Sequence, residues 1–446
     1  MALTGVEIFK LLPKTNCKKC GHPTCLAFAM KLAQRQASLD ACPDVSEEAK
    51  KLLGEASAPP VRPITLGTGD KAAKMGEETV LFRHEKKFVN PCIFAVEIKD
   101  SASDSEISAV VDGVLTSEMD RVGQKLRIDS IYISNDSNDA AKFEGVVKAV
   151  AAKAPAVPLI LATTNTAAAE AALKAVGDKK PLLYGADESN AEAMAGLAKA
   201  HKASLGVKAN GLEALASLTE KIKGLGVEDM VIDSGARSAK EILRDNTLIR
   251  RAAIKKNFKA LGYPVITFAQ RDDSMVELLV TATGVAKYSS IVVMKSVEKW
   301  KNLALFALRQ NIYTDPQVPM QVEQKIYNIG EPSADSPLLI TTNFSLTYFI
   351  VSGEVENSKV ASRLAVMDCE GLSVLTGWAA GKFTASKIAQ FIQDSGIEKE
   401  INHKELILPG YVAILSGSVE EKLPGWKVTV GPREANALPA FLKSRG

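Results

Sequence analysis

A repeated alternation of apolar runs with amphipathic segments limits the fold of this chain most strongly. The apolar, strand-like runs lie at residues 92–98, 128–133, 157–162, 181–184, 204–207, 230–232, 265–268 and 291–294. Helices are expected between and after them, at residues 105–122, 140–152, 167–176, 190–201, 212–225, 238–261, 275–286 and 298–309. Eight β-then-α units are typical of an α/β chain folded as a (β/α)8 TIM barrel, usually of about 250 residues. A doubly wound open sheet is the alternative fold.

Polar residues stand where these predicted strands end. The C-terminal mouth of a barrel carries its sites, so such residues could bind a ligand, although any strand becomes polar where it meets solvent. The residues concerned are Glu97, Lys99, Asn135, Asn165, Asn210, Asp233, Gln270 and Lys295.

Four of the six cysteines lie near the N-terminus with the spacing C-x2-C-x4-C-x16-C, at Cys17, Cys20, Cys25 and Cys42. Thiolates favour iron–sulfur clusters or zinc, and the x2 then x4 spacing favours a [4Fe–4S] cluster. Structural zinc remains an alternative, although its cysteines more often arrive as two C-x2-C pairs. Disulfides are the weakest interpretation, because the sequence shows no secretory signal and is long enough to build a core without them.

The length and charge of the chain restrict its class and its partners. With 446 residues, two to four domains are expected. A composition with 46% hydrophobic and 24% charged residues is that of a globular protein, and no apolar run approaches the length of a bilayer span. A net charge of +3 favours neither nucleic-acid binding nor a basic membrane anchor. A cytoplasmic location is therefore expected.

The predicted domain order follows from these patterns. Residues 1–58 are expected to form a small helical domain around the cysteines, with helices at 4–12 and 26–36 and a third from residue 46. Residues 59–90 are expected to form a linker with a short β-hairpin, from runs at 61–66 and 79–83. The barrel is assigned to residues 91–312, and prolines at 316, 319, 332 and 337 mark the boundary to residues 313–446.

Residues 313–446 read as a smaller α/β domain. Strands are expected at 338–342, 363–368, 405–409, 412–416 and 426–430. Most of them run into loops of small or hydroxylated residues, and in an open α/β sheet the ligand lies beyond the carboxyl ends of the strands. The dinucleotide fingerprint G-x-G-x-x-G, the P-loop and the cobalt-binding pattern D-x-H-x-x-G are all missing from these loops. The residues alone therefore indicate a ligand-binding domain without naming its ligand.

Several longer motifs carry a resemblance to a known family. They lie at residues 3–10, 16–30, 41–43, 76–88, 368–378, 408–411 and 425–435, and include Cys17-Lys-Lys-Cys20-Gly-His-Pro-Thr-Cys25 and Asp368-Cys-Glu-Gly-Leu-Ser-Val-Leu-Thr-Gly-Trp378. With these motifs the whole chain resembles the large (gamma) subunits of the corrinoid iron–sulfur proteins of the acetyl-CoA (Wood–Ljungdahl) pathway.

The resemblance implies two cofactor sites. It makes Cys17, Cys20, Cys25 and Cys42 ligands of a [4Fe–4S] cluster. It makes the last domain a Rossmann-like α/β domain that binds a base-off cobamide, a B12-type corrinoid, without a protein histidine on cobalt. The corrinoid loops map to Thr341, Thr342, Asn343, Ser345, Leu346, Thr347, Glu370, Gly371, Leu372, Ser373, Val374, Leu375, Thr376, Gly377, Gly431, Pro432 and Arg433. Thr376 is expected nearest the lower face of the cobalt.

The resemblance also implies an activity and partners. The chain would be a methyltransferase-type methyl carrier, in which cobalt(I) takes a methyl group from methyltetrahydrofolate, supplied by a separate methyltransferase, and passes it to acetyl-CoA synthase/CO dehydrogenase. Cobalt, and no side chain, would be the nucleophile, and the cluster would relay an electron from a ferredoxin or reductive activator to reactivate cobalt(II). A small subunit would complete a heterodimer. The alternatives are an Fe–S electron-transfer scaffold without corrinoid and a barrel methyltransferase with its own folate site.

Overall fold

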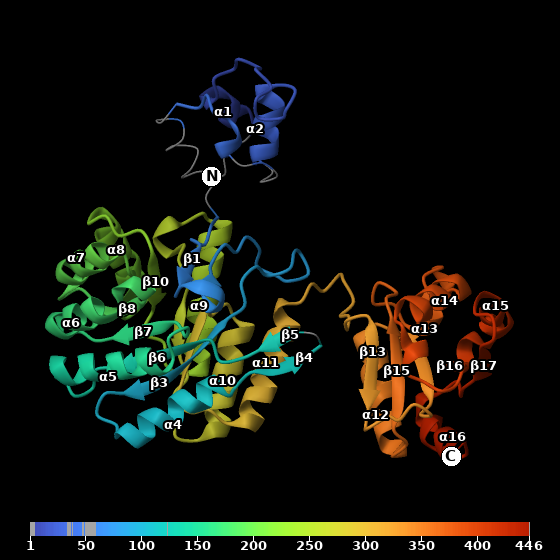
Figure 1. Ribbon diagram of the computed structural model, residues 1–446. Helices are drawn as coiled ribbons and strands as arrows, with labels where there is room; N and C mark the ends of the chain where they lie inside the picture. Colours follow the sequence, from blue (N-terminus) through green and yellow to red (C-terminus); the bar gives the residue numbers. More distant parts are fainter. Residues whose placement is uncertain are drawn as a thin grey trace. The chain divides into compact units, whose positions relative to one another are not determined.

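The computed structural model describes residues 5–33, 37, 39–46, 49, 59–122 and 124–445 (Figure 1). The chain divides into two compact units. The first comprises Met1–Glu118 and Leu126–Tyr313, and the second comprises Met119–Lys125 and Thr314–Gly446. Among the described residues, none of the helices has the length and hydropathy needed to span a membrane.

Eight parallel strands form the centre of the first unit. They are β3 (Ile93–Lys99), β6 (Ser130–Ser134), β7 (Leu159–Ala162), β8 (Leu182–Ala186), β9 (Ser204–Lys208), β10 (Met230–Asp233), β11 (Ile266–Phe268) and β12 (Ile291–Met294). Their order is β10-β9-β8-β7-β6-β3-β12-β11. The two edges meet where Ile232 pairs in parallel with Val265 and donates its N–H to Pro264 O at 2.8 Å. The sheet is therefore a nearly closed barrel, which confirms the predicted (β/α)8 architecture.

Helices follow the barrel strands in turn. They are α4 (Asp104–Leu115), α5 (Ala140–Lys153), α6 (Thr166–Val176), α7 (Ala191–His201), α8 (Leu212–Gly224), α9 (Ala239–Lys255), α10 (Ser274–Ala286) and α11 (Lys299–Tyr313). Local sequence explains several starts: Ser103 with Glu106 and Ser238 with Glu241 form capping boxes, in which serine and glutamate satisfy each other's backbone amides.

The predicted helix over residues 105–122 is wrong in its second half. Thr116 and Ser117 donate their hydroxyls to the carbonyls of Asp112 and Val114, at 2.8 and 2.7 Å, and α4 ends at Leu115. The chain then forms a two-stranded sheet of β4 (Met119–Arg121) and β5 (Gln124–Leu126). Apolar spacing did not reveal this hairpin, because the pairing of β4 with β5 leaves no signal in a helical pattern.

A β-hairpin contributes to the barrel core. β1 (Ile64–Leu66) pairs antiparallel with β2 (Ala73–Met75). Leu66 and Met75 belong to the same buried cluster as barrel side chains such as Ile160 and Phe268. The second strand of this hairpin was predicted at residues 79–83, which form no strand. The observed strand is β2 at residues 73–75, where Met75 packs into the barrel core.

The second unit has a five-stranded sheet in the order β13-β15-β14-β16-β17. Its strands are β13 (Lys325–Ile329), β14 (Leu338–Thr342), β15 (Ser362–Met367), β16 (Glu405–Leu408) and β17 (Lys427–Val430). Only β13 runs antiparallel to its neighbour. Along β14, Leu338 and Ile340 enter one hydrophobic cluster while Leu339 enters another, so both faces of the sheet are covered.

Helices cover this sheet and include one correction. They are α12 (Ser345–Ser358), α13 (Val374–Ala379), α14 (Ala385–Asp394), α15 (Ser416–Lys422) and α16 (Leu438–Lys443). Residues 412–416, predicted as a strand, instead lie in a 3-10 helix (Gly410–Leu415) that leads into α15.

The N-terminal segment of the first unit is helical around the cysteines. α1 (Gly5–Leu11) and α2 (Cys25–Ala33) pack around Ile8 and Phe28 in a cluster of their own. The helix predicted from residue 46 lies almost entirely outside the described residues.

Candidate functional sites

The loop between α1 and α2 is wound tightly around the first three cysteines. Lys14, Asn16, Lys18 and Gly21 all have positive φ angles, between 49° and 78°. Asn16 Oδ1 accepts a hydrogen bond from Cys25 N at 2.8 Å, and Asn16 N donates to Cys25 Sγ at 3.4 Å. The asparagine thus closes the loop and directs a backbone amide at a cysteine sulfur, as amides do at iron–sulfur sites.

Cys42 belongs to the same buried cluster as Cys25, with Cys20 packed against it. Lys19 forms an ion pair with Asp44 at 3.1 Å, and Cys17 Sγ donates to the same carboxylate at 3.6 Å. Cys25 and Cys42 are buried, Cys20 is half-buried and Cys17 is exposed. Burial and then the neighbouring thiols of Cys20, Cys17 and Cys25 raise the pKa of the Cys42 thiol. The four predicted ligands therefore belong to one small module.

The donor set of this module suits an iron–sulfur cluster chemically. Four thiols and a backbone N–H directed at sulfur are what such a cluster requires. Among the described residues, however, no three His, Cys, Asp or Glu side chains have the geometry that would hold a single metal ion.

An apolar cavity of about 400 Å³ lies in the second unit. Ile340 and Thr341 of β14 and Ile407 and Leu408 of β16 line it, together with the loop after β17. In sheet order the parallel strands read β15-β14-β16-β17, so consecutive connections leave β14 and β16 in opposite directions. The cavity is therefore at the switch point of the sheet, where α/β domains bind ligands.

The predicted corrinoid residues divide into two groups. Those that line the cavity are Thr341, Thr347, Ser373, Val374, Leu375, Gly431, Pro432 and Arg433. Those that do not are Thr342, Asn343, Ser345, Leu346, Glu370, Gly371, Leu372, Thr376 and Gly377. Thr376 lies exposed on α13, with its hydroxyl 2.9 Å from that of Ser373.

Sequence reasoning also missed part of the lining. Tyr411 and Glu434 both face the cavity, and the Tyr411 hydroxyl donates to the Glu434 carboxylate. Ile350 and Val351 of α12 add apolar surface. The sequence could have indicated Tyr411, because the segment Leu408-Pro-Gly-Tyr411 follows a predicted strand as the other candidate loops do. It could not have indicated Ile350 and Val351, since an apolar residue on a helix usually faces a core.

Two features of the cavity are typical of a ligand-binding site. The Thr341 hydroxyl is buried and has no hydrogen-bond partner among the described residues. The loops after β16 and β17 approach each other so closely that a Cβ on Gly410 would lie 2.6 Å from Gly431 O. A buried polar atom awaiting a partner and a backbone surface bare of side chains are both typical of a site for a flat ligand.

The polar strand ends of the barrel are largely engaged within the protein. Asn135 donates to Asp100 at 2.7 Å and accepts from Thr163 at 3.0 Å, and Asn165 caps α6. Asp233 is held by the Tyr184 hydroxyl at 2.6 Å and by both guanidinium nitrogens of Arg237. Asn210 instead lines a separate hollow beside Lys208 and Asp187.

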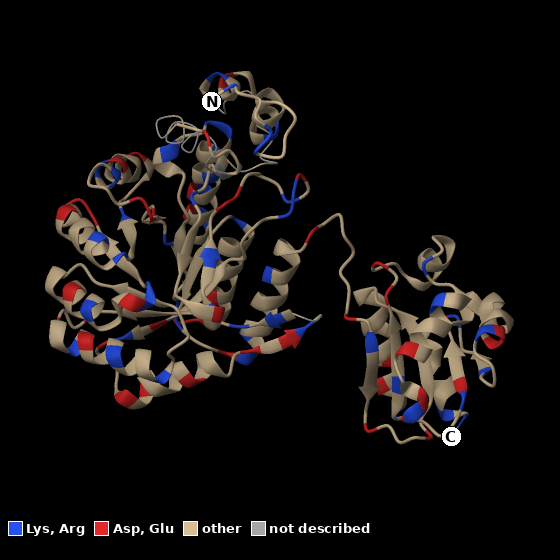
Figure 2. Cartoon of the chain, turned by 45° about the horizontal axis from the view of Figure 1, so that its top comes forward, with Lys and Arg blue, Asp and Glu red and all other residues tan. Residues whose placement is uncertain are grey.

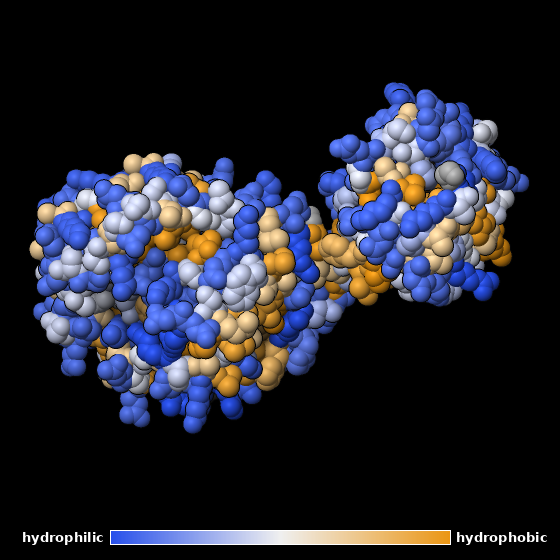
Figure 3. All heavy atoms as spheres, turned by 90° about the horizontal axis from the view of Figure 1, so that it is seen from below, coloured by the Kyte–Doolittle hydropathy of each residue, from blue (hydrophilic) through white to orange (hydrophobic). Residues whose placement is uncertain are grey.

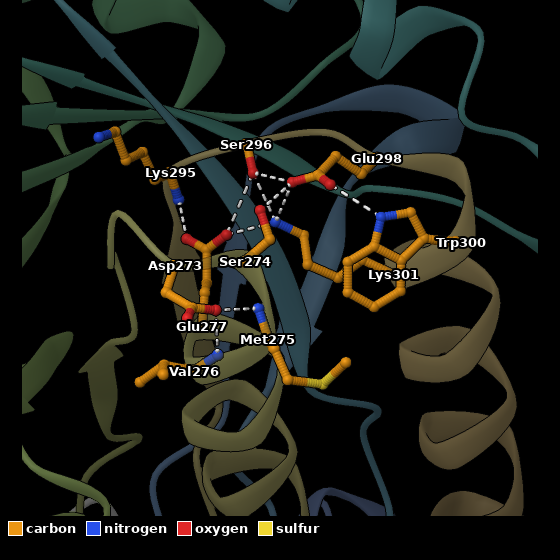
Figure 4. Close-up of polar contacts among 10 residues, drawn as sticks. All are labelled: Asp273, Ser274, Met275, Val276, Glu277, Lys295, Ser296, Glu298, Trp300 and Lys301. Carbon is orange, nitrogen blue, oxygen red and sulfur yellow. Dashed lines mark hydrogen bonds and ion pairs between the residues drawn. The ribbon is translucent and has the colours of Figure 1, made fainter.

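A buried ionic network joins α10 to the start of α11 (Figure 4). Glu277 and Lys301 form an ion pair, and both side chains are fully buried. Ser296 Oγ donates to Glu277 at 3.2 Å and accepts from Lys301 at 2.6 Å. Glu298 accepts from Ser296 and from Trp300 Nε1, each at 2.8 Å. Every charged group here has partners, so the network fixes the loop after β12.

Charges on the surface show no concentrated basic region. Figure 2 shows Lys and Arg residues interspersed with Asp and Glu residues along the described parts of both units. Nucleic-acid recognition normally requires a basic stripe or patch.

Comparison with known proteins relates these sites to a family. Over its full length the chain is 46% identical to the corrinoid/iron-sulfur protein large subunit of Moorella thermoacetica, covering 99% of that protein. The chain belongs to this family. Members of the family named acetyl-CoA decarbonylase/synthase complex subunit gamma are 34% identical in Methanothermobacter thermautotrophicus and 33% identical in Archaeoglobus fulgidus. The chain spans 99% and 97% of these two proteins.

Two family models match successive parts of the chain. One described as a putative Fe-S cluster covers residues 12–43, which include all four cysteines. One described as CO dehydrogenase/acetyl-CoA synthase delta subunit covers residues 63–442. The full-length relatives carry the name gamma or large subunit, and they include the N-terminal module, so the assignment to large subunits rests on them.

Proposed function

We propose that this chain is the methyl-carrying large subunit of a corrinoid iron–sulfur protein. The observation that carries the proposal is the combination of a four-cysteine module with a separate apolar cavity at the switch point of a second α/β sheet. The chain would carry a methyl group from methyltetrahydrofolate, through a methyltransferase, to acetyl-CoA synthase. The family relationship supports this role.

Cys17, Cys20, Cys25 and Cys42 would hold a [4Fe–4S] cluster. When bound, the cluster supplies one-electron transfer, and the cobamide supplies a nucleophilic cobalt whose cobalt(II) form the cluster would help to reduce. Asn16 would position Cys25 through its two hydrogen bonds to that residue. Burial of Cys25 and Cys42 would keep water from that side of the cluster.

Residues around the apolar cavity of the second unit would hold the cobamide. The strand order β15-β14-β16-β17 is that of flavodoxin-like sheets, which supports a Rossmann-like domain. A cobamide is much larger than 400 Å³, so the cavity itself would accept only a flat part of it. Exposed apolar side chains of Leu375, Tyr411 and Ile414 would cover more of its surface.

No histidine is positioned to bind cobalt in this unit. His403 is the single histidine of residues 314–446. Its ring contacts Ser336 O at 2.9 Å and accepts from Glu405 N at 3.2 Å. Ser336 precedes β14 and Glu405 is the first residue of β16, so His403 lies at the end of these strands opposite the loops that line the cavity. This arrangement supports a cobamide without a protein histidine on cobalt, and we propose that it is bound base-off.

We propose residues 1–58, 59–90, 91–312 and 313–446 as cluster domain, linker, barrel and corrinoid domain, in a cytoplasmic protein. A methyltransferase, acetyl-CoA synthase/CO dehydrogenase and a ferredoxin or reductive activator would be its transient partners. The name large subunit, carried by its relative, supports a small subunit as permanent partner.

The small subunit would dock on the outer face of α9–α11. Seven large apolar side chains are exposed there: Leu243, Leu248, Met275, Val276, Leu279, Trp300 and Leu303. Figure 3 shows hydrophobic patches between hydrophilic residues on the face seen from below. Trp300 is oriented by Glu298, and rigid exposed tryptophans are typical anchors of interfaces. Leu279→Glu should abolish co-purification with the small subunit, whereas Leu115→Glu on α4 should not.

The decisive test of the function is metal analysis of the protein purified anaerobically with its small subunit from cobamide-supplied cells. We expect about four irons and one cobalt per chain, with a base-off corrinoid spectrum. Iron without cobalt, even after cobamide reconstitution, would leave an electron-transfer scaffold. Folate binding by the cobalt-free chain would favour a barrel enzyme, and zinc in place of iron would refute the cluster.

A further inference from the structure

Asn343 is placed where it cannot serve as a polar contact for a ligand. It follows β14 and is only 3% exposed. Its side-chain N–H groups donate to Asp368 at 2.9 Å and to Gln321 at 3.2 Å. Its side-chain oxygen accepts from Cys369 N at 2.9 Å and from Gly371 N at 3.0 Å. An amide has two donors and two acceptor positions, so all four are taken by the protein.

The turn that Asn343 holds has an unfavourable backbone. Glu370 and Gly371 have φ angles of 58° and 71°, and two left-handed residues in succession are uncommon outside glycine. A Cβ on Gly371 would lie 2.7 Å from Gln321 and 2.9 Å from Pro319. The two amides that Asn343 receives flank Glu370, so this side chain fixes the strained part of the turn.

A strap of residues 319–324 supports the same turn from its other side. Gln321 pairs with Phe344, and Val322 N donates to Asn343 O at 2.9 Å. Gln324 accepts from Asp368 N at 2.7 Å, while Asp368 also accepts from Glu370 N at 2.8 Å. Asn343 thus lies at the junction of β14, the strap and the turn after β15.

The turn at residues 368–371 leads directly to residues that line the cavity. Val374 and Leu375, at the start of α13, line the cavity, and Thr376 follows them. We propose that Asn343 is a positioning residue for the corrinoid site: it locks the turn at residues 368–371 and so places Val374 and Leu375 against the cofactor. This inference rests on the proposed function. It assigns Asn343 an indirect role in place of the direct cofactor contact expected from the resemblance.

The test compares Asn343→Asp with the unaltered protein. The new carboxylate would face the oxygens of Asp368 and Gln321, so the turn should open. In the cofactor-free chain, hydrogen exchange of residues 368–376 should accelerate by about tenfold or more. Cobamide affinity should fall by at least about tenfold, and the cobalt(II)/(I) potential of the residual bound form should shift, with iron content unchanged.

Two controls separate positioning from general destabilisation. Asn402→Ala removes a hydrogen bond to Asp335 elsewhere in the unit, and Val355→Ala weakens its hydrophobic core. Neither should change exchange at residues 368–376 or the potential. If Asn343→Asp does not fold, the milder Gln321→Leu, which removes one acceptor of Asn343, serves in its place. Wild-type exchange, affinity and potential in the folded variant would overturn the inference, whereas failure of the unaltered chain to bind cobamide would instead overturn the proposed function.

Discussion

Glu277 and Lys301 show how much a single buried charge depends on its partner. Both are fully buried, and Lys301 contacts Glu277, Ser296 and Glu298 (Figure 4). Lys301→Met leaves a buried carboxylate without its cation and should lower the free energy of unfolding by about 3–5 kcal/mol. Lys299→Met, an exposed position on the same helix, should cause no measurable change. Equal urea midpoints for the two variants would contradict this reading of the network.

Glu298 gives this network a dependence on pH. Hydrogen bonds from Ser274 and Ser296 lower its pKa from 4.5 to about 2. A carboxyl whose pKa is lower in the folded chain than in the unfolded chain stabilises the fold. This contribution is fully present above the pKa of the unfolded chain and is lost as the pH falls from about 4.5 towards 2. The stability difference between wild type and Glu298→Gln should therefore be constant near neutral pH and shrink below about pH 4.5. Urea unfolding over a pH series measures it, and a difference that does not vary with pH would count against this role.

At the scale of elements, the β1–β2 hairpin is expected to be an integral part of the barrel core. Leu66 is fully buried among barrel side chains, whereas its neighbour Thr65 on the same strand is exposed. Leu66→Ala should therefore cost about 2–5 kcal/mol of stability, because it leaves a cavity. Thr65→Ala should change stability by less than about 0.5 kcal/mol. Circular dichroism during denaturation distinguishes them, and a silent Leu66→Ala would mean that the hairpin is peripheral.

At the scale of the whole molecule, the four-cysteine module and the apolar cavity, which are the two proposed cofactor sites, belong to different units. Changes at one should therefore leave the other intact, since the effects of changes at sites with no shared partners are usually additive. Cys25→Ser should reduce the iron content from about four per chain to a small residue while cobamide affinity stays within about twofold. Iron and cobalt analysis with a cobamide titration makes the comparison. Loss of cobamide binding as well would show that the cluster module supports the corrinoid site directly.

Local patterns predicted the barrel because each of its elements is encoded locally. Apolar runs mark the strands, and side chains such as Ser103 and Ser238 cap the helices that follow. The errors fell where partners distant in sequence decide. The chain leaves α4 at Leu115 to form a hairpin, and the inner strand of the first hairpin lies at residues 73–75, because Met75 meets barrel side chains that follow it much later in the sequence.

For the proposed corrinoid site, the sequence by itself indicated candidate loops, and only the tertiary structure decided which of their residues line the cavity. Thr341 and Thr342 are neighbours at the end of β14, yet Thr341 lines the cavity and Thr342 does not. Asn343 belongs to the same motif, yet its side-chain amide makes all of its hydrogen bonds to residues 321, 368, 369 and 371 of the protein. The spacing of the cysteines predicts a ligand set, because one loop carries three of them. The cavity required strands and loops from four separate parts of the chain, and no local pattern records how these meet.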